Sequence, residues 1–238
     1  MARILVTGSS TGLGYATARD LAAQGHDVVV HARNTAKVAA APVGRAWLGA
    51  VIGDLSDRRD VDDIVEQAAP FGVFDSIIHN AGVLDSPEVV PVNVVAPYLL
   101  TALLPAPERL VYLSSSMHRS GAADLSRFTQ RTAGYSDTKL WVTALTLAMA
   151  GRWPDTASHA VDPGWVPTRM GGAGATDDLV AGHETQVWLA TAEDLDPATG
   201  GYWHHRRTQD PHPAARDEAF QQALIALLED ETGVPLPR

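Results

Sequence analysis

Short apolar runs alternate along the chain with longer segments in which apolar residues recur at helical spacing. The apolar runs predict strands near 3–7, 27–31, 48–52, 74–79, 109–114, 157–162 and 201–204. The periodic segments predict helices near 12–24, 58–69, 88–104, 134–151, 183–193 and 214–231. Strands that alternate regularly with helices predict an α/β fold whose parallel sheet is covered by helices on both faces.

Length and composition favour a single domain over residues 1–238. The chain has the size of one α/β domain, and a hydrophobic content of 45% supplies a sizeable core. Because no apolar run reaches about 18 residues and no basic signal segment precedes the first strand, we expect no membrane span. The absence of cysteine excludes disulfides and thiolate metal sites and is typical of a cytoplasmic protein. We expect no bound metal.

The net charge of −10 argues against nucleic acid as a partner. It leaves room for an anionic cofactor, because backbone N–H groups and a single arginine can hold phosphates locally. Abundant alanine and arginine beside only two lysines, Lys37 and Lys139, are typical of a GC-rich bacterial genome.

A glycine-rich turn joins the first predicted strand to the first helix. Gly8, Gly12 and Gly14 lie in a G-x-x-x-G-x-G spacing within this strand–turn–helix context. In a dinucleotide-binding site such glycines allow a tight turn, approach of the backbone to the pyrophosphate and close helix packing. The helix N-terminus adds free N–H groups and the positive end of a dipole. The alternative is a plain glycine-rich turn.

Tyr135 and Lys139 are four residues apart on a predicted helix, so both side chains can point into one cleft. A free phenol has a pKa of about 10 and is a poor proton donor at neutral pH. A nearby ammonium favours the phenolate, so we expect Lys139 to lower the pKa of Tyr135 toward the working range of an acid/base catalyst.

Five motifs together resemble the short-chain dehydrogenase/reductase family. In order along the chain they are T-G-S-S-T-G-L-G at 7–14, N-A-G at 80–82, S-S at 114–115, Y-S-D-T-K at 135–139 and P-G at 163–164. Residues 109–170 and the tail look most like the retinol-dehydrogenase-like branch. The resemblance implies a Rossmann-type doubly wound sheet of about seven strands in three α/β/α layers. It also implies a substrate lid near 165–182, a C-terminal helix near 214–231, and leaves open assembly into a dimer or tetramer.

The resemblance assigns a nicotinamide cofactor to the strand ends. Ala32 stands where an NAD-binding acid would lie and Arg33 follows it, so we expect NADP(H) to be favoured over NAD(H). The alternative for Arg33 is a solvated loop charge, and for Thr168 a hydroxyl that bonds its own loop backbone. The implied cofactor-binding residues are Gly8, Ser10, Thr11, Gly12, Leu13, Gly14, Arg33, Asn34, Asp54, Leu55, Asn80, Ala81, Gly82, Tyr135, Lys139, Pro163, Gly164, Val166 and Thr168.

The implied catalytic residues are Ser115, Tyr135, Lys139 and Asn93. Ser115 would polarise a substrate carbonyl, with Ser114 as the alternative if the alignment shifts by one residue. Pro97 lacks an N–H, so the Asn93 carbonyl loses its helical partner and becomes a site for a relay water. The alternative is that Pro97 only kinks a packed helix.

Met117, His118, Trp165 and Met170 are expected to border an apolar or aromatic carbonyl substrate. The glycine-rich stretch 171–175 lies where the family places its lid, and the segments 34–46 and 83–92 look short for the family. The implied reaction is hydride transfer between NADPH and a carbonyl/alcohol pair. Two alternatives remain: a non-redox cyclase or epimerase on the same fold, and a non-catalytic NADP-binding regulatory protein.

Overall fold

The computed structural model describes residues 1–39 and 46–237. Its centre is an eight-stranded sheet in the order β3-β2-β1-β4-β5-β6-β7-β8, parallel except for the antiparallel β7–β8 pair. The strands are β1 (Arg3–Val6), β2 (Asp27–Ala32), β3 (Gly49–Ile52), β4 (Ser76–His79), β5 (Arg109–Leu113), β6 (Ala157–Asp162), β7 (Tyr202–His204) and β8 (Arg207–Thr208). The seven strands predicted from the sequence are confirmed to within two residues at each end.

The prediction of about seven strands misses β8. A two-residue turn joins β7 to β8, and both turn residues, His205 and Arg206, have positive φ angles of 48° and 59°. This conformation usually selects Gly, Asn or Asp. A His-Arg pair therefore carries none of the composition that marks a hairpin in a sequence.

The helices are α1 (Gly12–Ala23), α2 (Arg58–Ala68), α3 (Ala96–Leu103), α4 (Ser126–Thr129), α5 (Tyr135–Arg152), α6 (Leu179–Thr191) and α7 (Glu218–Thr232). The prediction of one helix over 88–104 is corrected, because a wider π-helical turn, Pro91–Val95, precedes α3. The helix α6 begins four residues earlier than predicted, where the Asp178 carboxylate caps it by accepting from the N–H of Ala181 at 2.9 Å.

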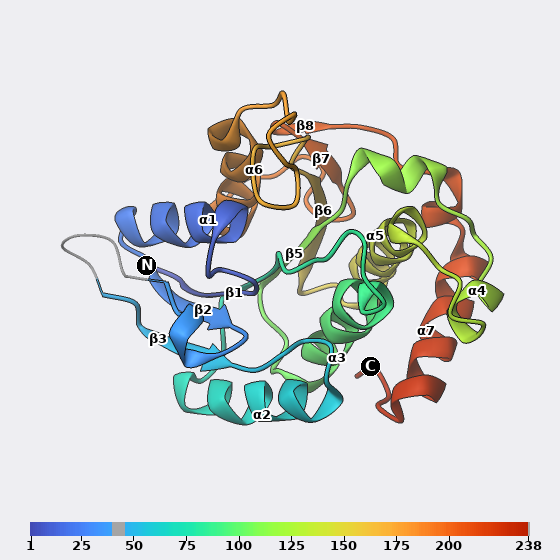
Figure 1. Cartoon of the computed structure of the whole chain (residues 1–238), viewed down its shortest axis with the longest axis horizontal. Coiled ribbons are helices and arrows are strands. Elements are labelled where there is room, and N and C mark those ends of the chain that lie inside the picture. Colours follow the sequence, from blue (N-terminus) through green and yellow to red (C-terminus); the bar gives the residue numbers. More distant parts are fainter. Residues whose placement is uncertain (40–45, 238) are drawn as a thin grey trace.

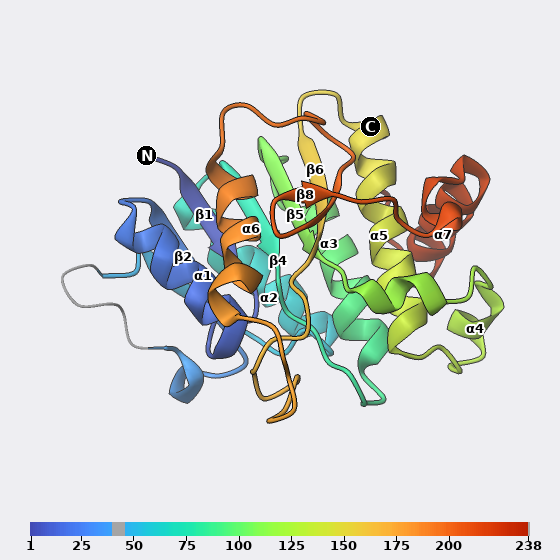
Figure 2. The same ribbon diagram turned by 90° about the horizontal axis from the view of Figure 1, so that it is seen from above.

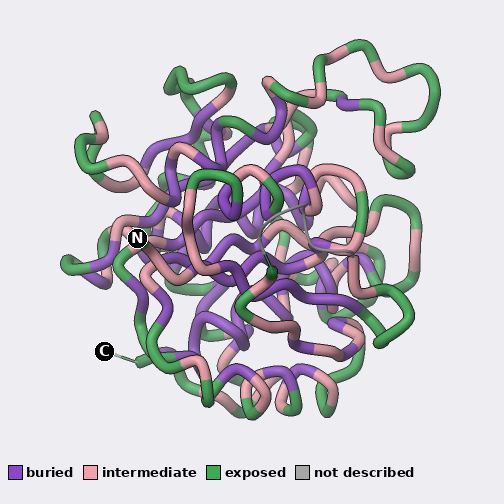
Figure 3. Tube along the Cα trace, turned by 90° about the vertical axis from the view of Figure 1, so that its left-hand side faces the viewer, coloured by how far each residue is buried: buried purple, intermediate pink, exposed green. Residues whose placement is uncertain are grey.

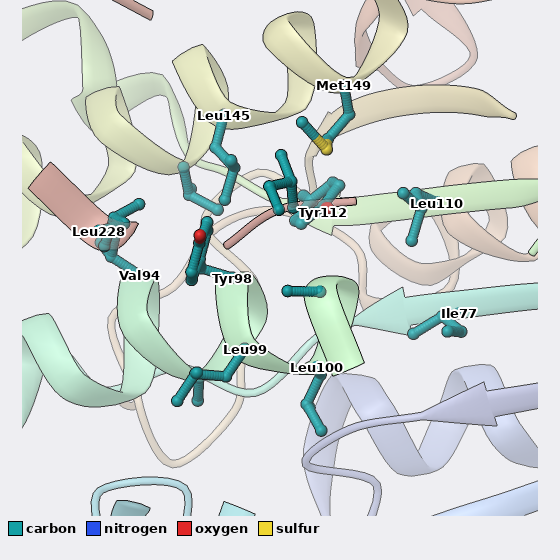
Figure 4. Close-up of a cluster of buried hydrophobic side chains, with 14 of the residues drawn as sticks. Ile77, Val94, Tyr98, Leu99, Leu100, Leu110, Tyr112, Leu145, Met149 and Leu228 are labelled. Atoms are coloured by element: carbon teal, nitrogen blue, oxygen red, sulfur yellow. The ribbon is translucent and has the colours of Figure 1, made fainter. Parts of the chain in front are cut away.

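Helices cover both faces of the sheet, as predicted (Figure 1). The helices α1 and α6 pack together on one face, and α2, α3 and α5 cover the other, with α7 outside α5 (Figures 1 and 2). Figure 4 shows the core between α3, β5, α5 and α7, to which Tyr98, Leu110, Leu145 and Leu228 all contribute. In Figure 3 the purple buried trace lies inside and the green exposed segments lie mainly in loops.

The parallel strands end at a common edge, called here the carboxyl edge, and the loops that follow them carry most of the predicted site. Open α/β sheets bind ligands at this edge. Residues 40–45, part of the segment predicted to be short at 34–46, lie outside the described residues. Within the described ranges, no helix combines the length and the apolarity that crossing a bilayer requires.

Candidate active site

The glycine turn after β1 is held close to the end of β4. Gly8 and Gly12 have positive φ angles of 64° and 58°, which glycine adopts without strain. A Cβ atom on Gly14 would overlap the Asn80 side chain and the Gly8 carbonyl, so this glycine lets α1 begin against β4. The turn between β1 and α1 therefore has the close backbone packing expected of a dinucleotide-binding loop.

His31, at the end of β2, holds this turn in place. The Gly8 N–H donates to its Nδ1 at 2.9 Å, and its Nε2 lies 2.9 Å from the carbonyl oxygen of Gly53. Nδ1 accepts, so the proton is on Nε2, and burial lowers the pKa of His31. This contact was not predicted, although a histidine next to the last residue of a largely apolar strand is a signal for it.

The residues predicted to contact the 2′-phosphate and the adenine of the cofactor follow the ends of β2 and β3. The Arg33 side chain is exposed, and its positive charge lowers the pKa of Asp54. Burial would raise the pKa of Asp54, but hydrogen bonds from Ser56 and the nearby Arg33 guanidinium and His31 ring lower it on balance. The Leu55 side chain is buried in the core, which leaves only its backbone for a cofactor.

Ser115 and Tyr135 form the centre of the candidate site. The Ser115 hydroxyl is close enough to the Tyr135 phenol to lower its pKa, and the Ser115 Oγ accepts from the N–H of Met117 at 3.2 Å. The buried Lys139 ammonium lies 5.4 Å from the centre of the Tyr135 ring and donates to the carbonyl oxygen of Leu113 at 2.7 Å. The structure thus brings together the three side chains that the motifs predicted.

The expected effect of Lys139 on Tyr135 is not found. Burial raises the pKa of Tyr135 to about 12, with the hydrogen bond from Ser115 lowering it and Asp162 raising it further. Burial likewise lowers the pKa of Lys139 to about 8. The expectation is wrong in sign because desolvation of the phenol dominates, while the Lys139 ammonium is bonded to the Leu113 carbonyl. A protonated phenol at neutral pH is nevertheless the form that donates a proton.

Ser114, the alternative to Ser115, has a buried side chain that pairs with another part of α5. Its hydroxyl is buried and lies 2.7 Å from the hydroxyl of Thr143 on α5. The side chain of Asn93 bonds both backbone groups of Val83 at 2.9 Å and the Thr138 hydroxyl at 3.1 Å. Asn93 therefore ties the loop after β4 to α5 beside the Tyr135–Lys139 pair, a contact that the analysis of its backbone carbonyl missed.

The loop after β6 reaches across to the glycine turn. Gly164 has a φ of 78°, Val166 is buried, and the Thr168 side chain packs against Gly12. The Thr168 hydroxyl accepts from the N–H of Gly171 at 3.2 Å, which is the loop-internal bond named as its alternative role. The residues predicted to hold the two ends of a cofactor therefore converge at the carboxyl edge.

Three of the four predicted substrate contacts are accessible. Met117, Trp165 and Met170 expose 46%, 54% and 42% of their surface. His118 is fully buried: its Nδ1 donates to the carbonyl of Ser115 at 2.7 Å and its Nε2 accepts from the N–H of His212 at 2.9 Å. The expectation that His118 borders the substrate is therefore not met in this structure.

Asp162 is a charged group at the site that the sequence analysis did not single out. It ends β6, is 5% exposed, and acts electrostatically on both Tyr135 and Lys139. The sequence held a signal for it, since an acidic residue that ends a buried strand at the carboxyl edge needs a partner or a function.

Known proteins resemble this chain over most or all of its length. The family model for short chain dehydrogenases matches residues 2–178. The short-chain dehydrogenase chyC of Penicillium rubens is 36% identical, with 100% of both chains covered. Human retinol dehydrogenase 13 is 28% identical over 94% of this chain and 82% of its own length. The curated relatives with the highest identity here are fungal, so a bacterial origin stays a prediction.

Solved structures share the fold. An uncharacterised protein of Mycobacterium paratuberculosis superposes with a TM-score of 0.84, covering 100% of this chain and 96% of its own, at 24% identity. A blue fluorescent protein from a metagenomic library, solved in complex with NADPH, superposes with a TM-score of 0.71 at 23% identity, covering 85% of this chain and 95% of its own.

The match to the short chain dehydrogenase model covers well over half of the chain. It agrees with the parallel sheet, the glycine turn and the serine, tyrosine and lysine at the carboxyl edge. The chain therefore belongs to the short-chain dehydrogenase/reductase family, whose members are NAD(P)-dependent oxidoreductases that act on CH–OH and C=O groups.

Proposed function

We propose that this enzyme is an NADP-dependent carbonyl reductase. The observation that carries the proposal is the gathering of Ser115, Tyr135 and the buried Lys139 ammonium at the carboxyl edge. Ser115 donates a hydrogen bond to the substrate oxygen, and Tyr135 gives it a proton. A Tyr135 pKa near 12 keeps the phenol protonated at neutral pH, which favours reduction over oxidation.

The residues at the carboxyl edge fit a dinucleotide. The Asn80 Oδ1 is buried without a hydrogen-bond partner in the described structure. Gly82 lies beside the Lys139 ammonium: a Cβ atom added to this glycine would be 3.6 Å from the Lys139 Nζ. The glycine turn and α1 would hold the pyrophosphate, while Asn80 and Lys139 would hold the riboses. When bound, the nicotinamide supplies the hydride for the carbonyl carbon.

The remaining roles belong to this chain's own groups. Lys139 holds the nicotinamide ribose, and its charge keeps that part of the site cationic up to about pH 8. The Asn93 backbone carbonyl anchors a water that returns a proton to Tyr135 through the Lys139 region, as Pro97 has no N–H for the i+4 bond to that carbonyl. The whole chain acts as one cofactor-binding domain.

An apolar substrate is supported by the side chains exposed around the site. Leu84, Met117, Trp165, Met170 and Val180 are all exposed large hydrophobics on the segments that follow β4, β5 and β6 at the carboxyl edge. Apolar surface that gathers in loops beside a catalytic group is typical of a ligand site. We therefore propose an apolar or aromatic ketone or aldehyde as substrate, to be identified by a carbonyl panel followed through NADPH absorbance.

The preference for NADP is supported by Arg33, an exposed guanidinium directly after Ala32 at the end of β2. A charge-assisted contact to the 2′-phosphate is worth about 1.5–3 kcal/mol, so Arg33→Ala should weaken NADPH binding roughly 10- to 150-fold. NADH, which has no 2′-phosphate, should lose little.

Fluorescence titration of both cofactors measures the effect, with Arg207→Ala on the exposed strand β8 as the control for loss of one surface charge. Equal losses for NADPH and NADH in Arg33→Ala would show that Arg33 does not select the phosphate.

A further inference from the structure

The short helical turn that follows Ser115 is attached to the fold through His118. In this turn, Ser116–Ser120, the His118 side chain is fully buried and the other residues are exposed. The carbonyl oxygen of Ser115 accepts twice from His118, from its N–H at 3.0 Å and from its Nδ1 at 2.7 Å. The backbone that carries the candidate hydroxyl is therefore held by one buried residue.

The two ring nitrogens of His118 face opposite kinds of partner. Nε2 lies 2.9 Å from the backbone nitrogen of His212, whose N–H can only donate, so Nε2 accepts and the proton is on Nδ1. Nδ1 faces the Ser115 carbonyl oxygen, which can only accept. Burial lowers the pKa of His118, which agrees with a neutral ring. The His212 N–H thus selects the tautomer that donates to Ser115.

This N–H belongs to a well-anchored segment. Residues 209–217, called here the C-terminal strap, join β8 to α7. Within the strap, the short turn Pro213–Arg216 packs against α5. Ala215 in this turn is fully buried, and its carbonyl accepts from the Gln221 side chain at 2.7 Å. The strap therefore holds the His212 N–H at a fixed place beside a residue 94 positions earlier in the chain.

The other end of the Ser116–Ser120 turn lies against α5 beside Tyr135. A Cβ atom added to Gly121, which follows the turn, would overlap the carbonyl oxygen of Ser136. The Ser120 hydroxyl donates to the Ser136 hydroxyl at 3.3 Å. A turn fixed at both ends holds the Ser115 backbone at a set place relative to the start of α5.

We propose that His118 is a positioning residue that holds Ser115 in its working orientation, and that the C-terminal strap fixes the tautomer with which it does so. The Nδ1–H bond sets the plane of the peptide after Ser115 and thereby the direction of the serine side chain. A ring with its proton on Nε2 would turn a lone pair toward the Ser115 carbonyl and release it. The role rests on the proposed function, in which Ser115 polarises the substrate carbonyl.

The first test compares two changes at His118. His118→Phe keeps a ring against Tyr202, whose ring centre lies 4.5 Å away, and removes both side-chain hydrogen bonds. With the aromatic ketone or aldehyde that the panel shows to react fastest, the single-turnover rate should fall about 10- to 100-fold, while NADPH affinity stays nearly unchanged. His118→Asn, whose amide nitrogen can donate from near the place of Nδ1, should recover most of the rate. A wild-type rate in His118→Phe would overturn the proposal.

A double-mutant cycle shows whether His118 acts through Ser115. Ser115→Ala removes the hydroxyl, so adding His118→Phe to it should lower the rate by less than about twofold further. Losses that multiply in the double variant would mean that His118 acts independently, and the proposal would be wrong while the proposed function stands. A wild-type rate in Ser115→Ala would instead refute the role of Ser115 in the proposed function, and the role of His118 with it.

The strap is tested at His212, whose φ of −53° proline can adopt. His212→Pro removes the N–H and His212→Ala retains it, while both remove the side chain that accepts from the N–H of Ala214. We expect the rate in His212→Pro to be well below that in His212→Ala. Equal rates would overturn the part assigned to the strap.

NMR of protein with ¹⁵N-labelled histidine reads the tautomer without an activity assay, with the His118 signals identified by their loss in His118→Phe. The proton should be on Nδ1 in wild type and in His212→Ala, and shared with Nε2 in His212→Pro. A proton on Nε2 in wild type would overturn the proposal. Should His118→Phe not fold by circular dichroism, the His212 pair, which leaves the buried ring in place, decides by the same comparison of rates.

Discussion

At the scale of single residues, the site is organised by burial. Tyr135 and Lys139 are brought together as their spacing predicted. Desolvation favours the neutral form of each, so it raises the pKa of Tyr135 to about 12 and lowers the pKa of Lys139 to about 8. A buried ammonium of this kind lowers the stability of the folded protein at pH values below the pKa of Lys139. The chain retains it, which is typical of a functional group held at a cost in stability.

This stability cost gives a prediction for Lys139→Met. Between about pH 8 and the unperturbed value of 10.5, the unfolded chain binds more protons at Lys139 than the folded chain does. The free energy of unfolding of wild type relative to Lys139→Met should therefore rise with pH across this window, by up to about 3 kcal/mol.

Urea unfolding at a series of pH values measures the difference. Lys37→Met, at the exposed second lysine, is the matched control and should show a constant difference. A difference for Lys139→Met that stays constant or falls with pH would mean that the ammonium is not buried as described.

At the scale of elements, the segment 165–178 connects β6 to α6 and folds back on itself. The Trp165 N–H donates to the Asp177 carboxylate at 2.6 Å, the Asp177 N–H donates to the Trp165 carbonyl at 3.0 Å, and the Trp165 indole donates to the Gly171 carbonyl at 2.9 Å. Most of the segment is exposed, and its bonds are local. Such segments open at low free-energy cost.

We therefore expect Met170–Asp178 to act as a lid. Its amides should exchange rapidly in the free enzyme and more slowly with NADPH and substrate bound, while the buried part of α5 stays protected in both states. Hydrogen exchange with mass spectrometry makes the comparison. Strong protection of this segment in the free enzyme would identify it as a rigid loop.

The elements also show which local signals a sequence carries. The strands were predictable because each is a short apolar run bounded by polar residues, and the glycine turn because its conformation selects glycine. The π-helical turn before α3 and the β7–β8 hairpin were not, since neither has a distinctive composition. The early start of α6 depends on the Asp178 cap, which its sequence context did not distinguish from loop aspartates.

At the scale of the whole molecule, the parallel sheet gathers residues from distant parts of the chain at one edge. The motifs predicted most of these groups individually. They could not predict Asp162, the His31 clamp or the burial of His118, because each depends on which strands and loops become neighbours. The sequence therefore predicts the candidate groups, and the fold determines their burial and their hydrogen-bond partners.

The central claim is that Tyr135 donates the proton in carbonyl reduction, and single-turnover kinetics of Tyr135→Phe test it most directly. We predict a fall in the rate of NADPH oxidation of about 100- to 10,000-fold, with NADPH affinity nearly unchanged, because the change removes only the acid. A variant that keeps more than roughly a tenth of the wild-type rate would contradict the assignment, since a general acid contributes far more than that.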